Sequence, residues 1–238
     1  MSKTLKLFFG ISYLIILFTF LYFIFSFIEI TRLDDFQYYK ELQTDLEKIT
    51  SENLYLNLFV FFSFSIIWIS LLGFGSPLLI ISGILFGKWL GTFVSLISIS
   101  LGALFLYLIA KFFFKEIILS LLKDKFNKYL TIFRRNEFTY FLFFRLAGGL
   151  GIPFGIQNIL PVLFNIKKFN YFFASFLGFA PMFFILNSIG SGLNEYIKME
   201  ENFSIINLLL KKDIYLPIIF FLIIMFISTK IKNKIFDN

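Results

Sequence analysis

Arg145 is the one charged side chain within a long apolar segment, FFRLAGGLGIPFGIQNILPVLF (residues 143–164). An arginine at membrane depth costs at least about 2.5 kcal/mol on insertion scales, so its presence needs a reason. The planar guanidinium stays charged when it is desolvated and can donate two parallel hydrogen bonds to a phosphate. Two interpretations stay open: Arg145 binds a phosphate or another anion in a cavity, or it braces the fold by donating to exposed carbonyls.

Glycine and proline follow this arginine in a pattern that favours a sharp turn. Gly148, Gly149 and Gly151 permit such a turn and leave backbone N–H groups accessible, an arrangement that suits an anion. Pro153 is placed to begin a returning helix at its first position, where its missing N–H costs nothing. Pro77, which follows GFGS, repeats this pattern earlier in the chain. The two patterns therefore predict two related turns.

Two amides lie one turn into the helix that Pro153 would begin. Gln157 and Asn158 either contact a ligand or cap backbone groups that the turn leaves free, and both alternatives stay open. Asn187, in a later apolar segment, is a weaker candidate. We therefore predict a substrate-binding site without catalytic residues, made by Arg145, Gly148, Gly149, Gly151, Pro153, Gln157, Asn158 and Pro77.

The composition indicates an integral membrane protein. Of the 238 residues, 58% are hydrophobic, whereas a soluble domain has about 45–50%. Most of the aromatic residues, 22% of the chain, are interpreted as lipid-facing. The chain has no cysteine and no histidine, which excludes disulfides, zinc sites built on these residues and Ser-His catalysis. We expect no enzymatic activity, no metal and no cofactor, and nucleic acid is not an expected partner because the bases flank apolar segments.

The apolar segments predict an all-α polytopic membrane protein. Residues 5–28 exceed the roughly 20 residues that cross a bilayer, so residues 1–28 are interpreted as a retained transmembrane helix rather than a signal peptide. A polar extracytoplasmic segment, 29–56, follows. Residues 115–137 are basic and amphipathic, as in a helix that lies on a membrane surface. Further spans are expected at 89–111, 169–189 and 215–231.

Two apolar segments are interrupted, and each predicts a re-entrant helical hairpin. The first, about 54–87, has its predicted tip at 73–77, and its second arm, 78–86, is too short to cross at about 1.5 Å per residue. The second, about 138–166, has its predicted tip at 148–153. Broken backbone at membrane depth is tolerated only where protein buries it or where it lines a watery cavity. We therefore expect the two tips to meet near the midplane.

The distribution of charge supports this topology through the positive-inside rule. If both hairpins return to the side they enter from and both termini are cytoplasmic, most bases lie inside and most acids, concentrated in 29–56, lie outside. Each hairpin is then followed by a span. The units 54–111 and 138–190 become oppositely oriented copies of one another, an organisation typical of secondary transporters.

The motifs in these units resemble a known family. SPLLIISGILFGKWLGTFVSLISISLGALFLYLIAKFFFK (76–115) is similar to the first half of the VTT domain, found in the SNARE-associated Golgi protein superfamily that includes the bacterial DedA proteins. Residues 144–193 are similar to its second half, and the chain looks closest to the Tvp38-like branch. A VTT-like membrane domain is thus expected at 57–193, followed by a region, 194–238, with a polar segment, the last span and a basic tail. The residues that carry the second half are Arg145, Pro153, Phe154, Asn158, Leu177 and Pro181.

The resemblance implies two opposed re-entrant hairpins and lipid translocation. Relatives are associated with phospholipid scrambling and with recycling of undecaprenyl phosphate, and Arg145 matches the family's basic residue in the second hairpin. DedA proteins carry an acidic residue soon after the proline of the first hairpin, and GSPLLIISG (75–83) has none. Downhill flipping is therefore expected rather than proton coupling.

These observations predict a flippase-like or scramblase-like translocator of phosphate-bearing lipids, such as a phospholipid or undecaprenyl phosphate. It is expected in the bacterial cytoplasmic (inner) membrane, with membrane lipids as partners and a homo-oligomer as a further possibility. One alternative is a noncatalytic membrane assembly or homeostasis factor, in which Arg145 is only a brace. A small-solute or ion secondary transporter is disfavoured, because the predicted spans carry no carboxylate.

Overall fold

The computed structural model describes residues 53–121 and 136–199 without interruption, together with isolated positions elsewhere. Every regular element in these two ranges is a helix. The predicted transmembrane helix at 1–28, nearly all of 29–56, much of the basic segment 115–137 and the last span at 215–231 lie outside them. The elements are α3 (Leu54–Ser70), α4 (Gly75–Phe113), α6 (Glu137–Leu146), η2 (Gly148–Gly151), α7 (Phe154–Ile159), η3 (Leu160–Val162) and α8 (Lys168–Met199).

Asparagine begins the first helix of each hairpin. The Asn53 side-chain oxygen accepts a hydrogen bond from the Leu56 backbone N–H at 3.0 Å, and Asn136 accepts one from the Thr139 N–H at 3.1 Å. Each bond satisfies one of the backbone donors that a helix leaves free at its N-terminus, a contribution of about 1 kcal/mol. These caps fix where α3 and α6 start.

The turn of the first hairpin follows α3 directly. The Gly73 N–H donates to the Trp68 carbonyl at 2.9 Å, and the Trp68 indole donates to the Phe74 carbonyl at 2.9 Å, which closes the turn. The predicted tip, 73–77, is placed too late, because α4 has already begun at Pro77. Proline is tolerated there because an N–H in the first turn of a helix has no partner to lose.

Gly87 divides α4 into a short arm and a long helix. Its φ of 71° and ψ of 174° belong to a backbone region that is essentially restricted to glycine. Across this break, the Ser82 hydroxyl donates to the Gly91 carbonyl at 3.0 Å and accepts from the Ser95 hydroxyl at 3.1 Å. The short arm therefore folds back along the long helix, as the predicted arm 78–86 requires.

The second hairpin turns through three glycines. Gly148, Gly149 and Gly151 have φ values of 63°, 68° and 79°, so the left-handed conformations expected of them are present. The expectation that Pro153 begins the returning helix is wrong by one residue. Pro153 is the N-cap of α7, because its ψ of 140° is extended and the first helical residue is Phe154.

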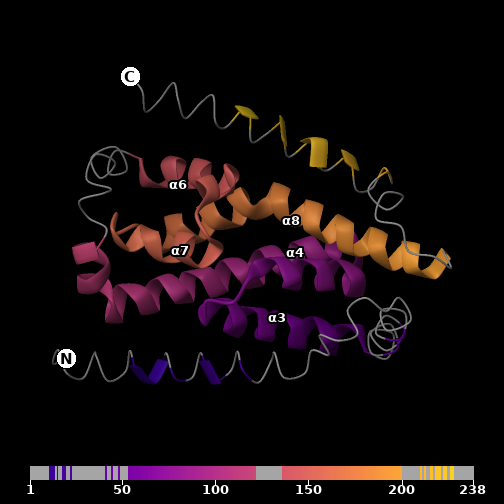
Figure 1. The fold of residues 1–238 in the computed structure, drawn as a ribbon, viewed down its shortest axis with the longest axis horizontal. Helices are drawn as coiled ribbons and strands as arrows, with labels where there is room; N and C mark the ends of the chain where they lie inside the picture. Colours follow the sequence, from indigo (N-terminus) through magenta and orange to yellow (C-terminus); the bar gives the residue numbers. More distant parts are fainter. Residues whose placement is uncertain are drawn as a thin grey trace.

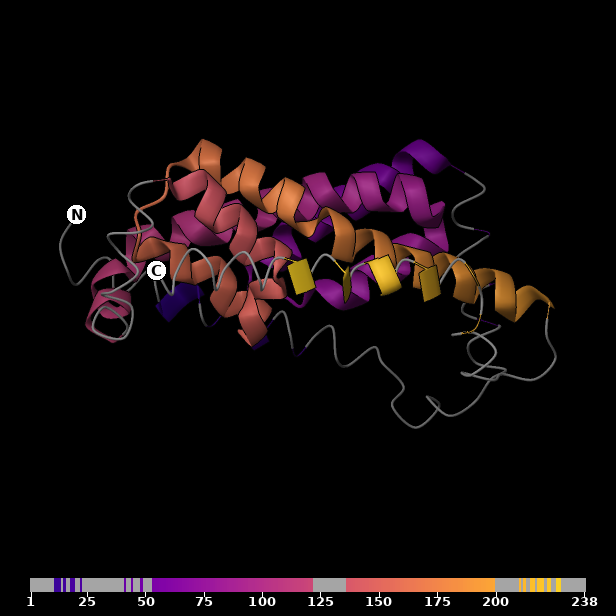
Figure 2. The same cartoon turned by 90° about the horizontal axis from the view of Figure 1, so that it is seen from above.

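The two long helices run antiparallel and form the centre of the molecule. Near one end Gly91 lies against the Asn187 side chain, and toward the other the rings of Tyr107 and Tyr171 stack at 4.7 Å. Figures 1 and 2 show α4 and α8 side by side, and Figure 1 shows α3 and α6 on opposite sides of this pair. The predicted span at 169–189 is part of α8, which continues to Met199.

The two hairpin tips are in contact. A Cβ added to Gly75 would lie 3.7 Å from the Phe154 ring, and one added to Gly155 would lie 3.1 Å from the Leu72 side chain. Gly75 begins the returning arm of the first hairpin, and Phe154 begins that of the second. The contact between tips that the sequence predicts is therefore present.

Residues in the first hairpin and its long helix each have a counterpart in the second hairpin and its long helix, always the same number of positions later in the sequence. Ile69 lies against Gly102 of the following long helix, and Arg145 lies in the same way against Gly178. Because the two long helices are antiparallel, the corresponding units point in opposite directions, as the inverted repeat requires. The matching pairs are Ile66 and Leu142, Ile69 and Arg145, Gly73 and Gly149, Pro77 and Pro153, Ser82 and Asn158, Ser95 and Tyr171, and Gly102 and Gly178.

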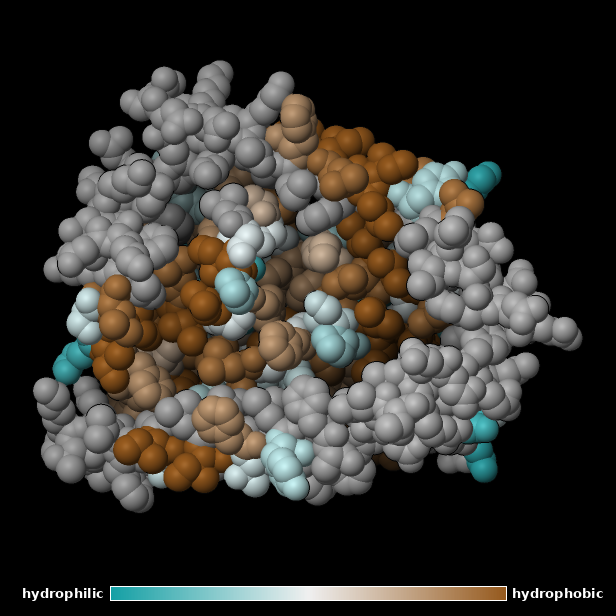
Figure 3. Space-filling view, in the orientation of Figure 1, coloured by the Kyte–Doolittle hydropathy of each residue, from teal (hydrophilic) through white to brown (hydrophobic). Residues whose placement is uncertain are grey.

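The surface of the described helices is mainly apolar. Two helices in the described ranges are long and apolar enough to cross a membrane, Gly75–Phe113 and Lys168–Glu195. Figure 3 shows mostly hydrophobic side chains over the described part of one face, with the most hydrophilic ones near its edges and a few weakly hydrophilic ones in the middle. This arrangement is consistent with a membrane protein whose long helices cross the apolar layer.

Candidate functional site

Arg145 enters the core at the last turn of α6. The residue is 3% exposed. It is buried because Gly178 of α8 has no side chain: an added Cβ there would collide with the Arg145 Cβ and lie 3.3 Å from the Leu142 carbonyl. The glycine allows α6 to approach α8 closely, which directs the guanidinium into the space between α6, α7 and α8.

Three side chains accept hydrogen bonds from the guanidinium. Arg145 Nη2 donates to Asn158 Oδ1 at 2.7 Å and to Tyr171 Oη at 3.0 Å. Its Nη1 donates to Gln157 Oε1 at 3.4 Å, which is a weak bond. Tyr171 Oη in turn donates to the Asn158 carbonyl at 3.2 Å. The network joins α6, α7 and α8, so Arg145 does contribute to holding the second hairpin together.

Aromatic rings cover the rest of the guanidinium. Its Cζ lies 4.7 Å from the centre of the Phe141 ring, 4.5 Å from that of Phe179 and 5.6 Å from that of Tyr171. Such contacts are worth about 2 kcal/mol or more when they are desolvated. These three residues were not among the candidates, and the interpretation of most aromatic residues as lipid-facing does not hold for them, since all three are buried.

The charge of Arg145 is not neutralised by a carboxylate in the part of the chain that the structure describes. No ion pair joins it to any described residue, and no described acid is among the groups that act on it electrostatically. Two buried donors at the site, Arg145 Nε and Asn158 Nδ2, also have no hydrogen-bond partner among the described residues. A buried cation beside donors that lack acceptors is suited to an anion, which supplies charge and acceptor atoms together.

Gln157 caps the turn of the second hairpin. Its Nε2 donates to the Ile152 carbonyl at 2.6 Å and to the Gly148 carbonyl at 3.2 Å. A Cβ on Gly149 would collide with the Gln157 side chain, so this glycine is needed to make room for it. Of the two alternatives for Gln157, capping of freed backbone groups is the one that the geometry shows directly.

The structure brings only some of the predicted site residues together. Arg145, Gln157 and Asn158 are in contact, and Gly149 lies beneath Gln157. The remaining glycines and Pro153 line the exposed side of the same tip, and nothing lies within 4 Å of a Cβ added to Gly148 or Gly151. Pro77 is exposed and belongs to the other hairpin.

A second polar cluster lies at the other end of the long helices. Asn187 is fully buried, its Nδ2 donates to the Phe183 carbonyl at 2.9 Å, and its Oδ1 would lie 2.5 Å from a Cβ on Gly91. A Cβ on Gly83 would collide with the Asn187 carbonyl. This cluster is separate from the one around Arg145, and it packs α8 tightly against both arms of α4.

The described residues form an all-helical fold that includes two helices long and apolar enough to cross a membrane, which is consistent with a membrane protein. The VTT domain matches residues 73–192, half of the sequence, and the chain belongs to this family. The VTT domain is part of the DedA family, which is linked to membrane transport or lipid-related functions. A search of the solved structures found no match.

Proposed function

We propose that the protein moves a phosphate-bearing lipid between the leaflets of a membrane and that Arg145 contacts the lipid phosphate. The observation that carries this proposal is the buried, unneutralised charge of Arg145 beside the unbonded donors Arg145 Nε and Asn158 Nδ2. Membership of the VTT family supports a lipid-related function. A phospholipid and undecaprenyl phosphate both supply the required phosphate.

The energetic argument concerns the cost of an unpaired charge. A buried ion costs several kcal/mol even after the surroundings relax, and the neutral partners Asn158 and Tyr171 offset only part of this cost. A phosphate that reaches the guanidinium compensates the charge and accepts from the free Nε. Asn158 and Tyr171 fix the orientation of the guanidinium plane, so the edge that carries Nε stays available to each lipid headgroup that arrives.

The headgroup reaches Arg145 by separation of the hairpin tips. In the present conformation the residue is 3% exposed, so the site is closed. The contacts that separate are those of Gly75 with Phe154 and of Leu72 with Gly155. Next to the tip, Phe74 is 63% exposed and Ile156 is 49% exposed, which offers an apolar surface to the lipid tails while the headgroup is inside.

The proposal includes the arrangement in the membrane. Both hairpins are re-entrant, both termini are cytoplasmic, and the membrane is the bacterial cytoplasmic (inner) membrane. The protein is not an enzyme, its partners are membrane lipids, and movement is downhill because GSPLLIISG (75–83) has no carboxylate for proton coupling. Within its superfamily we assign the chain to the Tvp38-like branch.

Reconstitution into liposomes tests the function. Vesicles that carry fluorescent phosphatidylglycerol are treated with dithionite, which bleaches only the outer leaflet, so the extent of bleaching reports translocation. We expect wild-type protein and Lys88→Gln, a control that removes a charge from the other end of the long helix, to translocate. Arg145→Gln is expected to lose most of the activity while its unfolding transition in detergent remains cooperative.

The alternatives give different results. A folded wild-type protein that moves no lipid would instead support the noncatalytic assembly or homeostasis factor. Translocation at the wild-type rate by folded Arg145→Gln would leave Arg145 as a structural brace.

A further inference from the structure

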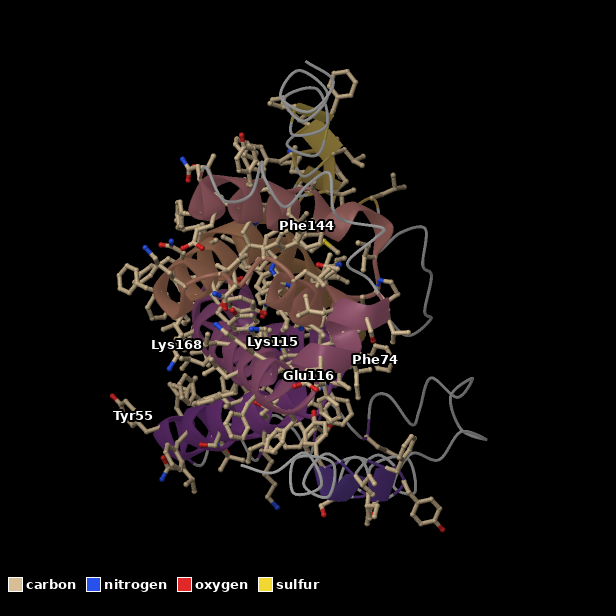
Figure 4. The ribbon with its side chains drawn as sticks, turned by 90° about the vertical axis from the view of Figure 1, so that its left-hand side faces the viewer. Tyr55, Phe74, Lys115, Glu116, Phe144 and Lys168 are labelled. Atoms are coloured by element: carbon tan, nitrogen blue, oxygen red, sulfur yellow. The ribbon has the colours of Figure 1, made fainter. Side chains whose placement is uncertain are left out.

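Lysines from both halves of the molecule gather where α4 ends and α8 begins. Lys111 lies in the last turn of α4, and Lys115 lies in the helical segment that follows it. Lys167 and Lys168 are exposed at the start of α8. Figure 4 looks onto this end of the molecule and labels Lys115 and Lys168, which come from different helices. Lys115 and Lys168 both act electrostatically on Lys111, so the three ammonium groups are neighbours.

The two described carboxylates at this end neutralise the lysines only in part, although Glu137 acts electrostatically on Lys111 as well. Glu137 accepts a hydrogen bond from the Asn170 amide at 2.6 Å, and both of its oxygens lie 3.4 Å from the Lys167 backbone nitrogen. Its carboxylate therefore ties α6 to the start of α8. Glu116 is the other described acid here and is exposed to solvent. Among the described residues at this end, four lysines against two carboxylates give a net positive charge.

Lys111 differs from the other three lysines because its ammonium group is positioned. It is partly buried, its Nζ donates to Tyr107 Oη at 3.3 Å, and it lies 5.4 Å from the centre of the Tyr107 ring. Tyr107 is itself fixed, since its hydroxyl donates to the Ile166 carbonyl at 2.7 Å. An ammonium group has three donors, and the one bond within the described residues uses a single donor.

A continuous set of contacts joins Lys111 to Arg145. The Tyr107 ring stacks on the Tyr171 ring at 4.7 Å with an interplanar angle of 16°. Tyr171 Oη accepts from Arg145 Nη2 at 3.0 Å. The two stacked tyrosines therefore lie between a partly exposed cation at the end of the molecule and the buried cation at the hairpin tip.

We propose that Lys111 forms an outer subsite that binds the phosphate headgroup of an anionic lipid before the headgroup reaches Arg145 between the separated hairpin tips. This inference rests on the proposed function and deepens it. The free donors of Lys111 bind the phosphate, and Lys115, Lys167 and Lys168 raise the local concentration of anionic lipid. Phe112 is 54% exposed and Phe169 is 72% exposed at the same end, where they suit contact with the first carbons of the acyl chains.

Equilibrium binding to the full-length protein in detergent tests the subsite without any translocation. The probes are fluorescent phosphatidic acid and fluorescent phosphatidylcholine with identical chains, and the variants are Lys111→Gln, Lys111→Arg and the matched control Lys88→Gln. Because one lysine near an anionic headgroup contributes about 1 kcal/mol, we expect Lys111→Gln to bind phosphatidic acid about fivefold more weakly. Its affinity for phosphatidylcholine stays unchanged, and Lys111→Arg and Lys88→Gln bind both probes like the wild type.

Other outcomes overturn the inference. Wild-type affinity of Lys111→Gln for phosphatidic acid would remove Lys111 from the site, and an equal loss for both probes would show that Lys111 does not select an anionic lipid. Displacement of phosphatidic acid by low-millimolar inorganic phosphate, with the same dependence on Lys111, would assign the subsite to free phosphate instead of a lipid. The translocation assay of Arg145→Gln tests the proposed function separately. The Lys111 subsite can therefore fail while the proposed function holds, and the reverse.

Discussion

Arg145 lies directly against Gly178, in the same relationship that Ile69 has to Gly102 in the opposite half. A Cβ on Gly178 would collide with the Arg145 Cβ, and one on Gly102 would lie 2.8 Å from the Ile69 Cβ. The backbone arrangement is thus repeated, while the side chain at its centre is an arginine in one half and an isoleucine in the other. The anion chemistry of the proposed site is therefore confined to the second hairpin.

This relationship predicts the effect of a single methyl group in each half. Gly178→Ala and Gly102→Ala each force a long helix away from the first helix of its hairpin, and overpacking of this kind costs about 1–3 kcal/mol. We expect both variants to unfold at lower temperature in detergent. Only Gly178→Ala is expected to reduce lipid translocation strongly, because it displaces Arg145. Equal residual activity in the two variants would contradict a special role for the second hairpin.

The turn of the second hairpin predicts a contrast between two adjacent glycines. Both have left-handed φ values, which asparagine tolerates better than most residues. Space is open around Gly148, whereas a side chain on Gly149 collides with Gln157. We expect Gly148→Asn to stay within about 0.5 kcal/mol of the wild type in stability, as for an ordinary surface change. Gly149→Asn is expected to lose stability and activity, and the reverse order in thermal unfolding would count against the described turn.

Opening of the hairpin tips predicts inhibition by a reversible cross-link. The chain has no cysteine, and Leu72 packs against Gly155 across the contact between the tips. In Leu72→Cys/Gly155→Cys, oxidation is expected to form a disulfide and stop translocation, and a thiol reductant is expected to restore it. Each single-cysteine variant serves as the control for oxidation. An oxidised, fully cross-linked protein that still translocates would show that the tips need not separate.

The sequence predicts the breaks in the helices because glycine and proline act locally. The glycines of the second tip adopt the expected left-handed conformations, and the break between the short arm and the long helix falls at Gly87. The precise ends of the turns are less predictable, since proline fits several neighbouring positions at the start of a helix. Pro77 accordingly lies inside the first turn of α4, while Pro153 precedes the first turn of α7.

The surroundings of Arg145 could not be predicted in the same way. Phe141 and Tyr171 reach it through packing of α6 and α8, and in a chain that is 22% aromatic a single ring gives no signal by its type. The sequence does indicate the glycine that lies against Arg145, because Gly178 corresponds to Gly102 at the same interval that relates Pro153 to Pro77. Matching the two halves residue by residue identifies both glycines as helix contacts.

The central claim is that Arg145 contacts the phosphate of the lipid, and a comparison of two lipids tests it most directly. Translocation rates of fluorescent phosphatidic acid and of fluorescent ceramide, which has no phosphate, are measured in the same proteoliposomes. Wild-type protein is expected to move the phosphate-bearing lipid faster, and folded Arg145→Gln is expected to lose this preference. If folded Arg145→Gln keeps the wild-type preference, Arg145 does not contact the phosphate and the proposed site is wrong.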